Sequence, residues 1–574
     1  MFRFVLVLLG LSIGVNAVVA GAPDVVLPVQ TLYYGGPIIT MEGGEPNYVE
    51  AVVTRGGKII YTGKKSVLTH QMSSEMESVD LQGKTMLPGF IEPHVHPSIA
   101  ALILSGDIIA PHDWHVPQGL KKGVEGHDAY IARLKQSIAV RGKKGEMLFV
   151  WGYHALWHGD LSRSILNAIS PDIPLAVIHR SFHEVFLNDQ AIDLLGIKRD
   201  DFDTNPQVEW DAGHFFEGGW MALVPKIAPV LIDPVRYKRG LADMTKLIRN
   251  SGITTIAEQG FPTSSFGMEY ALLKAELDKN PPYDVYNVLN GTQLARMKGS
   301  NERAEEFIKN APANYNTQNI YMLPKQVKLF ADGAIYSLAM QMKDGYSDGF
   351  EGQWMTPPAV LEQQMNFYWD RGYKIHIHAN GDLGIQLCLD ITEKMMRRNP
   401  RKDHRLTLHH VGYFTDDQAQ EIQKLGIEVS ANPYYLWALS DKYSQYGLGP
   451  DRATSLVQLK LLKERNVPFS LHSDFGMAPL EPLNLVWTAV NRVTAGQTLV
   501  SSDQRLDVFT AMQGITINAA RTLQLEHELG SIKVGKTANF TLLYENPFKV
   551  EPMRLKDIRV AGVVHRGRLQ MNSK

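Results

Sequence analysis

The sequence predicts an α/β protein: a parallel (β/α)8 barrel of the TIM type, a β-domain formed by both ends of the chain, and an insertion after the first barrel strand. Through the middle of the chain, short apolar runs such as residues 374–378 and 406–410 alternate with helix-like segments, which is typical of parallel β/α architecture. Both ends are instead rich in β-branched runs separated by glycines. The middle is also long enough for eight strands, which favours a closed barrel over an open sheet.

The composition is that of a soluble globular protein. The chain has 574 residues, of which 44% are hydrophobic and 21% are charged, enough for a large core and several domains. Its 58 basic and 60 acidic residues give a net charge of −2, so it lacks the basic footprint of proteins that bind nucleic acids or membrane surfaces. We therefore expect a small molecule as its partner, with the formation of homo-oligomers left open.

Cys388 is the single cysteine of the chain. Its isolation excludes an intramolecular disulfide and a zinc site built on thiolates. Any bound metal must therefore use histidine, carboxylate or an oxygen derived from lysine.

The N-terminus has the pattern of a secretory signal peptide. Arg3 is followed by an apolar stretch over residues 4–15 and then by small residues that end in Ala20-Gly21-Ala22, as in a cleavable leader. The alternative is an uncleaved membrane anchor, but the stretch is at the lower limit of what can span a bilayer. We expect residues 1–22 to be removed and the protein to be exported, to the periplasm or the medium, with no membrane contact after cleavage.

The β-domain is expected from residues 23–88 and 516–574. At the N-terminal end, the runs 51–54 and 58–61 surround Gly56-Gly57, which is a hairpin signal. At the C-terminal end, residues 538–544 and 559–564 have the same character. The barrel is then expected over residues 89–515.

Residues that can bind a metal follow several of the predicted barrel strands. His94 and His96 come after the apolar run 87–91, and positions i and i+2 of a strand share a face. A lone buried histidine is usually structural, but four strands that end in this way are more specific, because catalytic residues of barrels lie at the C-terminal strand ends. The other three strand ends carry His376 and His378, His409 and His410, and His472 and Asp474. Of the adjacent His409 and His410, only one is expected to point inward.

The spacing assigns these residues to strands. A barrel of this type uses about 31 residues per strand–helix unit. His378 to His410 is one unit, and His410 to Asp474 is two, with residues 427–430 as the strand between them. Lys328 precedes His378 by one unit and a long loop, so Lys328, His378, His410 and Asp474 are expected after strands four, five, six and eight. Between His96 and Lys328 there is an excess of about 139 residues over three units, which predicts an insertion within about 106–220 that covers the substrate.

An ordered set of motifs identifies a family resemblance. The segments LPGFIEPHVH, VKLFADGA, IHIHANGD, LHHVG, LHSDFGMAP and GSIKVGKTANF resemble those of the metal-dependent amidohydrolase superfamily, in particular the branch of N-substituted formamide deformylase and related exported amidohydrolases. The resemblance covers nearly all of the mature chain. It implies a (β/α)8 barrel with a β-sandwich assembled from both termini, in agreement with the layout above.

The resemblance also implies a divalent metal site with one or two ions per chain. The implied ligands are His94, His96, Lys328, His378, His410 and Asp474. Lys328 would be carboxylated, so that its carbamate bridges two ions. The alternative is an unmodified lysine that packs in the barrel beside a one-ion site of His94, His96, His378 and Asp474. Zinc is the expected metal because it suits imidazole and carboxylate ligands, with iron and manganese as alternatives.

The chain departs from the family pattern at some positions. Glu92, followed by Pro93, stands where the family has an aspartate, and His409 stands where a carboxylate precedes the strand-six histidine, so the choice of His410 rests on that alignment. Asn539 replaces an aspartate away from the site. Four residues of the insertion also resemble branch-typical positions, with either substrate contact or support of the insertion as their role: Arg180, His183, Asn188 and Glu217.

The expected reaction is hydrolysis of a carbon–nitrogen bond other than a peptide bond, in a linear or cyclic amide, by a metal-activated hydroxide. Asp474 would pass the proton to the leaving nitrogen, and a neutral His183 or His410 would stabilise the oxyanion. The alternatives are an ester, lactone or carbamate hydrolase with the same site, and an exported solute-binding protein without turnover. Tyr434, Tyr435 and Trp437 either line an aromatic pocket or pack in the core.

Overall fold

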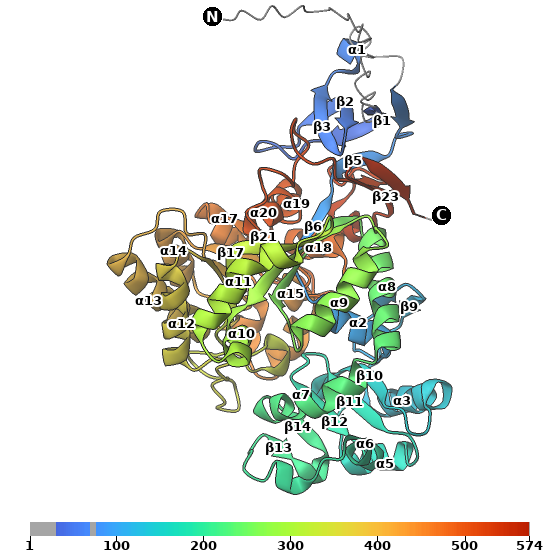
Figure 1. Cartoon of the computed structure of the whole chain (residues 1–574), viewed down its shortest axis with the longest axis vertical. Helices are drawn as coiled ribbons and strands as arrows, with labels where there is room; N and C mark the ends of the chain where they lie inside the picture. The colour runs from blue at the N-terminus through green and yellow to red at the C-terminus, as the bar shows by residue number, and fades with distance from the viewer. Residues whose placement is uncertain (1–29, 69–75, 573–574) are drawn as a thin grey trace, which may run out of the picture.

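The computed structural model of the protein describes residues 30–68 and 76–572. The signal peptide predicted for residues 1–22 lies outside these ranges. Figure 1 shows a terminal sheet and an inserted domain at opposite ends of a central barrel. Within the described ranges, we find no helix that combines the length and the apolar character needed to cross a bilayer.

The central barrel has eight strands that follow one another in chain order around the sheet. All of the pairings along this path are parallel. The strands are β6 (Phe90–Val95), β15 (Ile253–Phe261), β16 (Asp284–Asn290), β17 (Ile320–Phe330), β18 (Lys374–Ala379), β19 (Thr407–His410), β20 (Glu428–Ala431) and β21 (Phe469–Leu471). The two ends of the path meet where the N–H of Asp474 donates to the carbonyl of His94 and the N–H of His96 donates to the carbonyl of Phe475, both at 3.1 Å. The predicted barrel is confirmed.

Helices follow most of the barrel strands. They are α2 (Pro97–Ser105), α8 (Pro234–Asn250), α9 (Phe266–Leu277), α10 (Gly291–Lys298), α11 (Asn301–Tyr315), α12 (Pro358–Asp370), α13 (Asp382–Arg398), α14 (Asp416–Leu425), α15 (Tyr434–Gln445), α16 (Pro450–Thr454), α17 (Leu459–Glu464), α18 (Pro482–Asn491), α19 (Val508–Gly514) and α20 (Ile517–Thr522). Local sequence fixes their ends: α14 begins with a capping box between Thr415 and Gln418 and ends at Gly426 in the left-handed region, where glycine has no steric penalty.

Both ends of the chain contribute to one eight-stranded sheet. Its strands are β1 (Gln30–Ile39), β2 (Tyr48–Arg55), β3 (Lys58–Gly63), β4 (Glu77–Asp80), β5 (Thr85–Pro88), β22 (Phe540–Leu543), β23 (Val560–His565) and β24 (Arg568–Met571), with the short helix α1 (Lys65–Leu68) after β3. Antiparallel pairing of β5 with β22 joins the N-terminal part to the C-terminal part. Buried residues from both parts, such as Tyr33, Val52 and Phe540, share one core. The predicted β-domain of both termini is therefore confirmed, as one continuous hydrogen-bonded sheet.

The insertion leaves the barrel after α2 and returns at α8. It holds a six-stranded sheet in the order β13-β14-β12-β11-β10-β7, seen at the lower end of Figure 1. Its elements are β7 (Asp107–Ile108), β8 (Trp114–Val116), β9 (Gly119–Lys121), α3 (His127–Arg141), β10 (Leu148–Tyr153), α4 (Ala155–His158), α5 (Arg163–Ile169), β11 (Leu175–His179), β12 (Glu184–Leu187), α6 (Asp189–Leu195), β13 (Val208–Glu209), β14 (His214–Phe216) and α7 (Gly218–Leu231). The last of these, α7, brings the chain back over the barrel.

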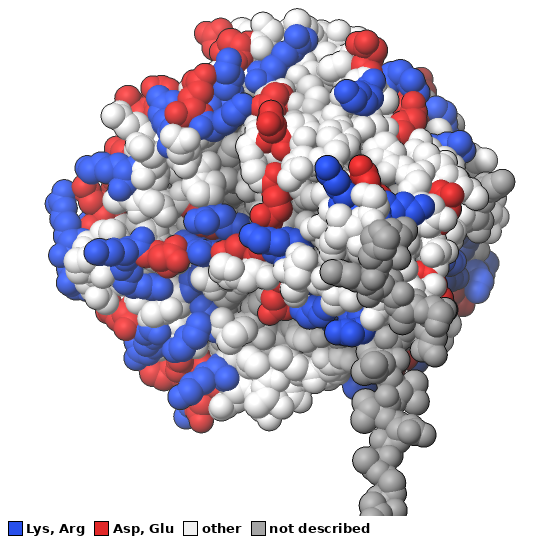
Figure 2. All heavy atoms as spheres, turned by 90° about the horizontal axis from the view of Figure 1, so that it is seen from above, with Lys and Arg blue, Asp and Glu red and all other residues white. Residues whose placement is uncertain are grey.

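The surface charge is mixed. Figure 2 shows acidic and basic side chains interspersed over the face at the end of the terminal sheet. No field of one sign is visible on that face, in line with the balanced net charge of −2.

Candidate metal centre

His94 and His96 come together with Asp474 at the C-terminal end of the barrel. The Nε2 atoms of His94 and His96 lie 3.5 and 3.1 Å from the same carboxylate oxygen, Oδ1 of Asp474. One ligand atom from each of these three residues lies within 4.8 Å of the others. The i, i+2 parity of β6 therefore does bring both rings to one place.

The loop after β21 holds Asp474 against β6. Asp474 has a φ of 57°, and its N–H donates to the carbonyl of His94 at 3.1 Å. Glu92, two residues before His94, accepts a hydrogen bond from the N–H of Ser473 at 2.8 Å. Burial raises the pKa of Glu92 to about 8. Glu92 thus connects β6 to the loop that positions Asp474.

The expectation that only one of His409 and His410 points inward is wrong. Nδ1 of His409 lies 2.8 Å from Nδ1 of His94, and Nδ1 of His410 lies 3.6 Å from Oδ2 of Asp474. Strand alternation fails here because His410, the last residue of β19, and Val411 have φ values of 78° and 48°, outside the range of an extended strand. Both rings consequently face the barrel interior.

A chain of hydrogen bonds runs from His94 into the barrel. His409 joins Nδ1 of His94 to Nδ1 of His376, at 2.8 and 2.9 Å. Nε2 of His376 lies 2.9 Å from Oε1 of Gln326, whose amide nitrogen donates to the carbonyl of Leu523 at 3.0 Å. Because the Gln326 oxygen can only accept, His376 donates through Nε2, His409 donates to His376, and His94 donates to His409. This order of donors leaves the lone pair of His94 Nε2 free to face Asp474.

Glu258 fixes the orientation of the His96 ring through a hydrogen bond to its Nδ1 atom. Its Oε1 lies 2.7 Å from Nδ1 of His96, which leaves Nε2 for the side of Asp474. Burial alone would lower the pKa of His96, but the carboxylate of Glu258 and the nearby Asp474 raise it to about 9. The sequence analysis missed Glu258 because it did not assign β15; the β-branched run Ile253–Ala257 followed by a carboxylate was the available signal.

Lys328 lies at the end of β17, beside β18, as the spacing predicted. Its side chain is fully buried, and among the described residues its Nζ has no hydrogen-bond partner. Burial lowers the pKa of Lys328 to about 7. On the neighbouring strand, Nε2 of His378 lies 2.9 Å from the amide nitrogen of Asn380, and the ring of His378 lies 4.4 Å from that of His410.

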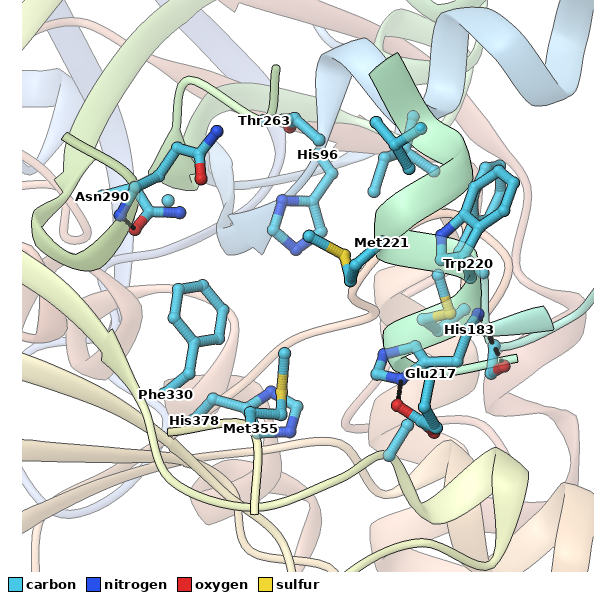
Figure 3. A pocket seen from close by; sticks show the side chains of 18 of the residues that line it. His96, His183, Glu217, Trp220, Met221, Thr263, Asn290, Phe330, Met355 and His378 are labelled. Carbon is cyan, nitrogen blue, oxygen red and sulfur yellow. Dashed lines mark hydrogen bonds and ion pairs between the residues drawn. The ribbon is translucent and has the colours of Figure 1, made fainter. Parts of the chain in front are cut away.

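All of the predicted metal ligands line one cavity of about 560 Å³. They are His94, His96, Lys328, His378, His410 and Asp474. Figure 3 shows His96 and His378 around this space, with His183 and Glu217 on its other side. The structure therefore brings together the whole set that the sequence proposed.

His183, predicted as a catalytic residue, is paired with Glu217. Nδ1 of His183 lies 3.0 Å from the Glu217 carboxylate, and the N–H of Glu217 donates to the carbonyl of His183 at 2.9 Å. Burial lowers the pKa of His183, but the charge of Glu217 outweighs it and raises the pKa overall. This favours a protonated His183, where a neutral ring was expected. Glu217 has a φ of 43°, a backbone strain that recurs at functional sites.

The other insertion positions have structural contacts. Asn188 caps α6 through the N–H of Ala191 and accepts from the N–H of Leu175 at 2.9 Å. Arg180 is fully buried, with its guanidinium 4.3 Å from the ring centre of Tyr336. Asn188 therefore supports the insertion, and Arg180 packs on Tyr336, which lines the cavity.

The aromatic residues after β20 divide into two roles. Tyr435 lines the cavity, and its hydroxyl lies 3.3 Å from Nδ1 of His410. Tyr434 and Trp437 pack against each other with ring centres 4.9 Å apart. Of the three, Tyr435 is thus the one that reaches the site.

The donor set fits a divalent cation. Imidazole nitrogens and a carboxylate converge, and two further buried nitrogens, Lys328 Nζ and His410 Nε2, lack hydrogen-bond partners among the described residues. Burial lowers the pKa of His94 and of His410, which keeps both rings in the neutral form that binds metals. A second cluster consists of His94, His409 and His472. Ring nitrogens of these residues are already engaged in hydrogen bonds, between His94 and His409 and to the neighbours His376 and Ser430. The set around Asp474 is therefore the candidate metal site.

Comparison with known proteins identifies the family. Residues 77–570 match the Amidohydrolase family, and the chain belongs to it. The protein is accordingly a hydrolase of the metal-dependent amidohydrolase superfamily, as the motifs predicted.

Individual relatives cover nearly the whole chain. Protein LONG AFTER FAR-RED 3 of Arabidopsis thaliana is 25% identical, over 91% of this chain and 88% of its own length. N-substituted formamide deformylase of Arthrobacter pascens is 23% identical, over 89% of this chain and 93% of its own. The crystal structure of an uncharacterised metal-dependent hydrolase from Pyrococcus horikoshii has a TM-score of 0.71 and 22% identity, and covers 91% of this chain and 99% of its own. This structural likeness shows a shared fold.

Proposed function

We propose that the protein is an exported, metal-dependent hydrolase that cleaves the carbon–nitrogen bond of a linear or cyclic amide other than a peptide bond. The observation that carries the proposal is the convergence of the Nε2 atoms of His94 and His96 on Oδ1 of Asp474, at 3.5 and 3.1 Å, inside a cavity. The name of the Arthrobacter relative, a formamide deformylase, supports amide hydrolysis.

One or two cations would be held by six residues of this cavity, which are His94, His96, Lys328, His378, His410 and Asp474. A divalent ion there would supply Lewis acidity toward a carbonyl group and would acidify water. Zinc is the proposed ion, because nitrogen and carboxylate donors suit it.

Asp474 is the proposed proton carrier. Burial raises its pKa, but the imidazole of His96 and the surrounding positive groups lower it below the usual range, so its carboxylate is ionised and can accept a proton from water. It then delivers that proton to the leaving nitrogen. The paired His183, whose pKa is raised by Glu217, is the proposed donor to the carbonyl oxygen as negative charge develops there.

Lys328 is the proposed bridge between two ions, as a carbamate. An uncompensated buried ammonium is costly, and burial already lowers the pKa of Lys328 to about 7. The neutral amine is the form that reacts with carbon dioxide. The resulting anion would supply two oxygen ligands, whereas an unmodified lysine would leave a one-ion site.

The export part of the proposal depends on the N-terminal apolar stretch over residues 4–15. N-terminal sequencing of the protein recovered from its native cells is expected to give a start near Gly21 or Pro23. An intact Met1 would contradict cleavage.

Catalysis is tested by metal analysis and turnover of the purified protein on N-formyl, N-acyl and cyclic amides, with matched esters and lactones in parallel. We expect one or two zinc ions per chain and turnover of amides. The double variant His94→Ala, His96→Ala is expected to lose most of the metal and all activity. His404→Gln is the matched control, because His404 is a buried histidine bonded to the carbonyl of Leu425 at 2.8 Å, away from the cavity lining. Activity that persists in the double variant would overturn the site, and turnover of esters alone would overturn the bond type.

A further inference from the structure

We infer that the substrate is an amide with one elongated apolar substituent, and that helix α7 of the insertion binds this substituent. The inference rests on the proposed function and adds the substrate class to it. It follows from three properties of the cavity: the chemistry of one wall, the exposure of residues at its edge, and the contrast with the opposite wall.

One face of α7 forms an apolar wall. The residues that line the cavity occupy positions i, i+1, i+4, i+7, i+8 and i+11 of the helix, so they share a face. They are Trp220, Met221, Val224, Ile227, Ala228 and Leu231. With about 1.5 Å of rise per residue, this face extends along roughly 16 Å of helix. Ile99 and Leu102 of α2 continue it.

Two methionines at the edge of the cavity are exposed although they are apolar. Met221 is 53% exposed and Met355 is 42% exposed. Figure 3 shows their side chains directed into the same open space from α7 and from the loop that carries Met355. Clustered apolar exposure of this kind is typical of binding sites, and methionine adapts its shape to apolar partners.

The opposite wall is polar. It is formed by the loop after β15, the last residue of β16 and the helix α10, with the residues Thr263, Ser264, Asn290, Thr292, Gln293 and Arg296. Figure 3 shows Asn290 across the space from Trp220 and Met221, with Thr263 beside His96 at the upper edge. A small polar amide would leave the accessible residues of the α7 face, Met221, Val224 and Ala228, in contact with water. An amide with an apolar arm covers that face and keeps its polar part toward the metal ligands and the polar wall.

The expected size of the effect follows from methylene burial. Each methylene moved from water to the α7 face contributes about 0.8 kcal/mol, which corresponds to about a fourfold rise in kcat/KM. We therefore expect kcat/KM to rise steeply along a homologous series until the wall is covered.

The test uses two substrate series on the metal-loaded protein, N-alkylformamides and N-methyl alkanamides, from one carbon to ten in the alkyl or acyl chain. A rise in one series identifies which side of the amide lies on α7. Met221→Glu is expected to lower kcat/KM for the long members at least tenfold more than for the shortest one. Ala222→Glu is the matched control, because Ala222 is the next residue of α7, is exposed and does not line the cavity, and it is expected to retain the full chain-length dependence.

A binding assay separates this inference from the proposed function. The fluorescent probe N-phenyl-1-naphthylamine is expected to bind the wild type and to be displaced by N-octylformamide, and Met221→Glu is expected to weaken both steps. Turnover of short amides with no chain-length dependence in either series would overturn the inference and leave the proposed function standing. Absence of turnover with all amides would overturn the proposed function, and displacement of the probe would then still support an apolar site on α7. Failure of N-octylformamide to displace the probe from the wild type would overturn the inference that α7 binds an apolar substituent.

Discussion

Replacement of His409 by leucine tests whether the hydrogen-bond chain behind His94 supports metal binding. His409 is fully buried and joins His94 to His376 through bonds of 2.8 and 2.9 Å. Leucine fills a similar volume but makes neither bond, so two buried ring nitrogens lose their partners. At about 1–3 kcal/mol for each unsatisfied buried group, we expect the free energy of unfolding to fall by roughly 2–6 kcal/mol.

The same change is expected to weaken the metal site. Without His409 as acceptor, Nδ1 of His94 no longer fixes the tautomer and ring orientation that present Nε2 to the cavity. Loss of such a supporting hydrogen bond lowers metal affinity about 10–100-fold. Zinc affinity is measured by competition with a chromogenic chelator, and the protonation of Nδ1 of His94 is followed by ¹⁵N NMR of histidine-labelled, metal-free protein.

His404→Leu is the matched control for this prediction. His404 is also a buried histidine with two partners, the carbonyl of Leu425 at 2.8 Å and the N–H of Leu406 at 2.9 Å, and it does not line the cavity. We expect a comparable loss of stability with unchanged zinc affinity. His409→Gln should recover part of the affinity, because its amide can accept from one ring and donate to the other. Wild-type affinity in folded His409→Leu, or equal loss in His404→Leu, would refute the reasoning.

Three further predictions concern Lys328, Glu217 and Cys388. Lys328→Ala is expected to bind one ion instead of two and to regain part of its activity when a short carboxylic acid is added; unchanged metal content and rate would indicate an ordinary lysine. Glu217→Gln removes the charge that raises the pKa of His183. The ion pair of His183 with Glu217 contributes fully to the stability of the fold below the ordinary pKa of histidine. This contribution is lost as the pH rises through the raised pKa of His183. Denaturant titrations should therefore show the largest loss of stability at acidic pH, and a loss independent of pH would contradict the pairing. Cys388 is fully buried and burial raises the pKa of its thiol, so alkylation should require unfolding; rapid labelling of the native protein would be inconsistent with this.

The sequence by itself determined the fold class and the strand ends that carry the candidate ligands. Alternation of apolar strands with helices follows from local pattern, and the nearly constant length of a strand–helix unit let the spacing of Lys328, His378, His410 and Asp474 assign them to their strands. Parity along β6 was equally local, since successive side chains of a strand alternate between its two faces. These predictions needed no knowledge of contacts between distant residues.

Tertiary structure alone decided how these ligands are supported and what surrounds them. His94 meets His409 across 315 residues of sequence, and His96 meets Glu258 across 162, so no local pattern identifies these partners. The inward direction of both His409 and His410 goes with the positive φ at His410, a backbone conformation that strand parity in the sequence does not predict. The apolar face of α7 lines the cavity only because the insertion folds back over the barrel. The sequence alone does not show which residues lie opposite this face, so it could not suggest the proposed binding of an apolar substituent.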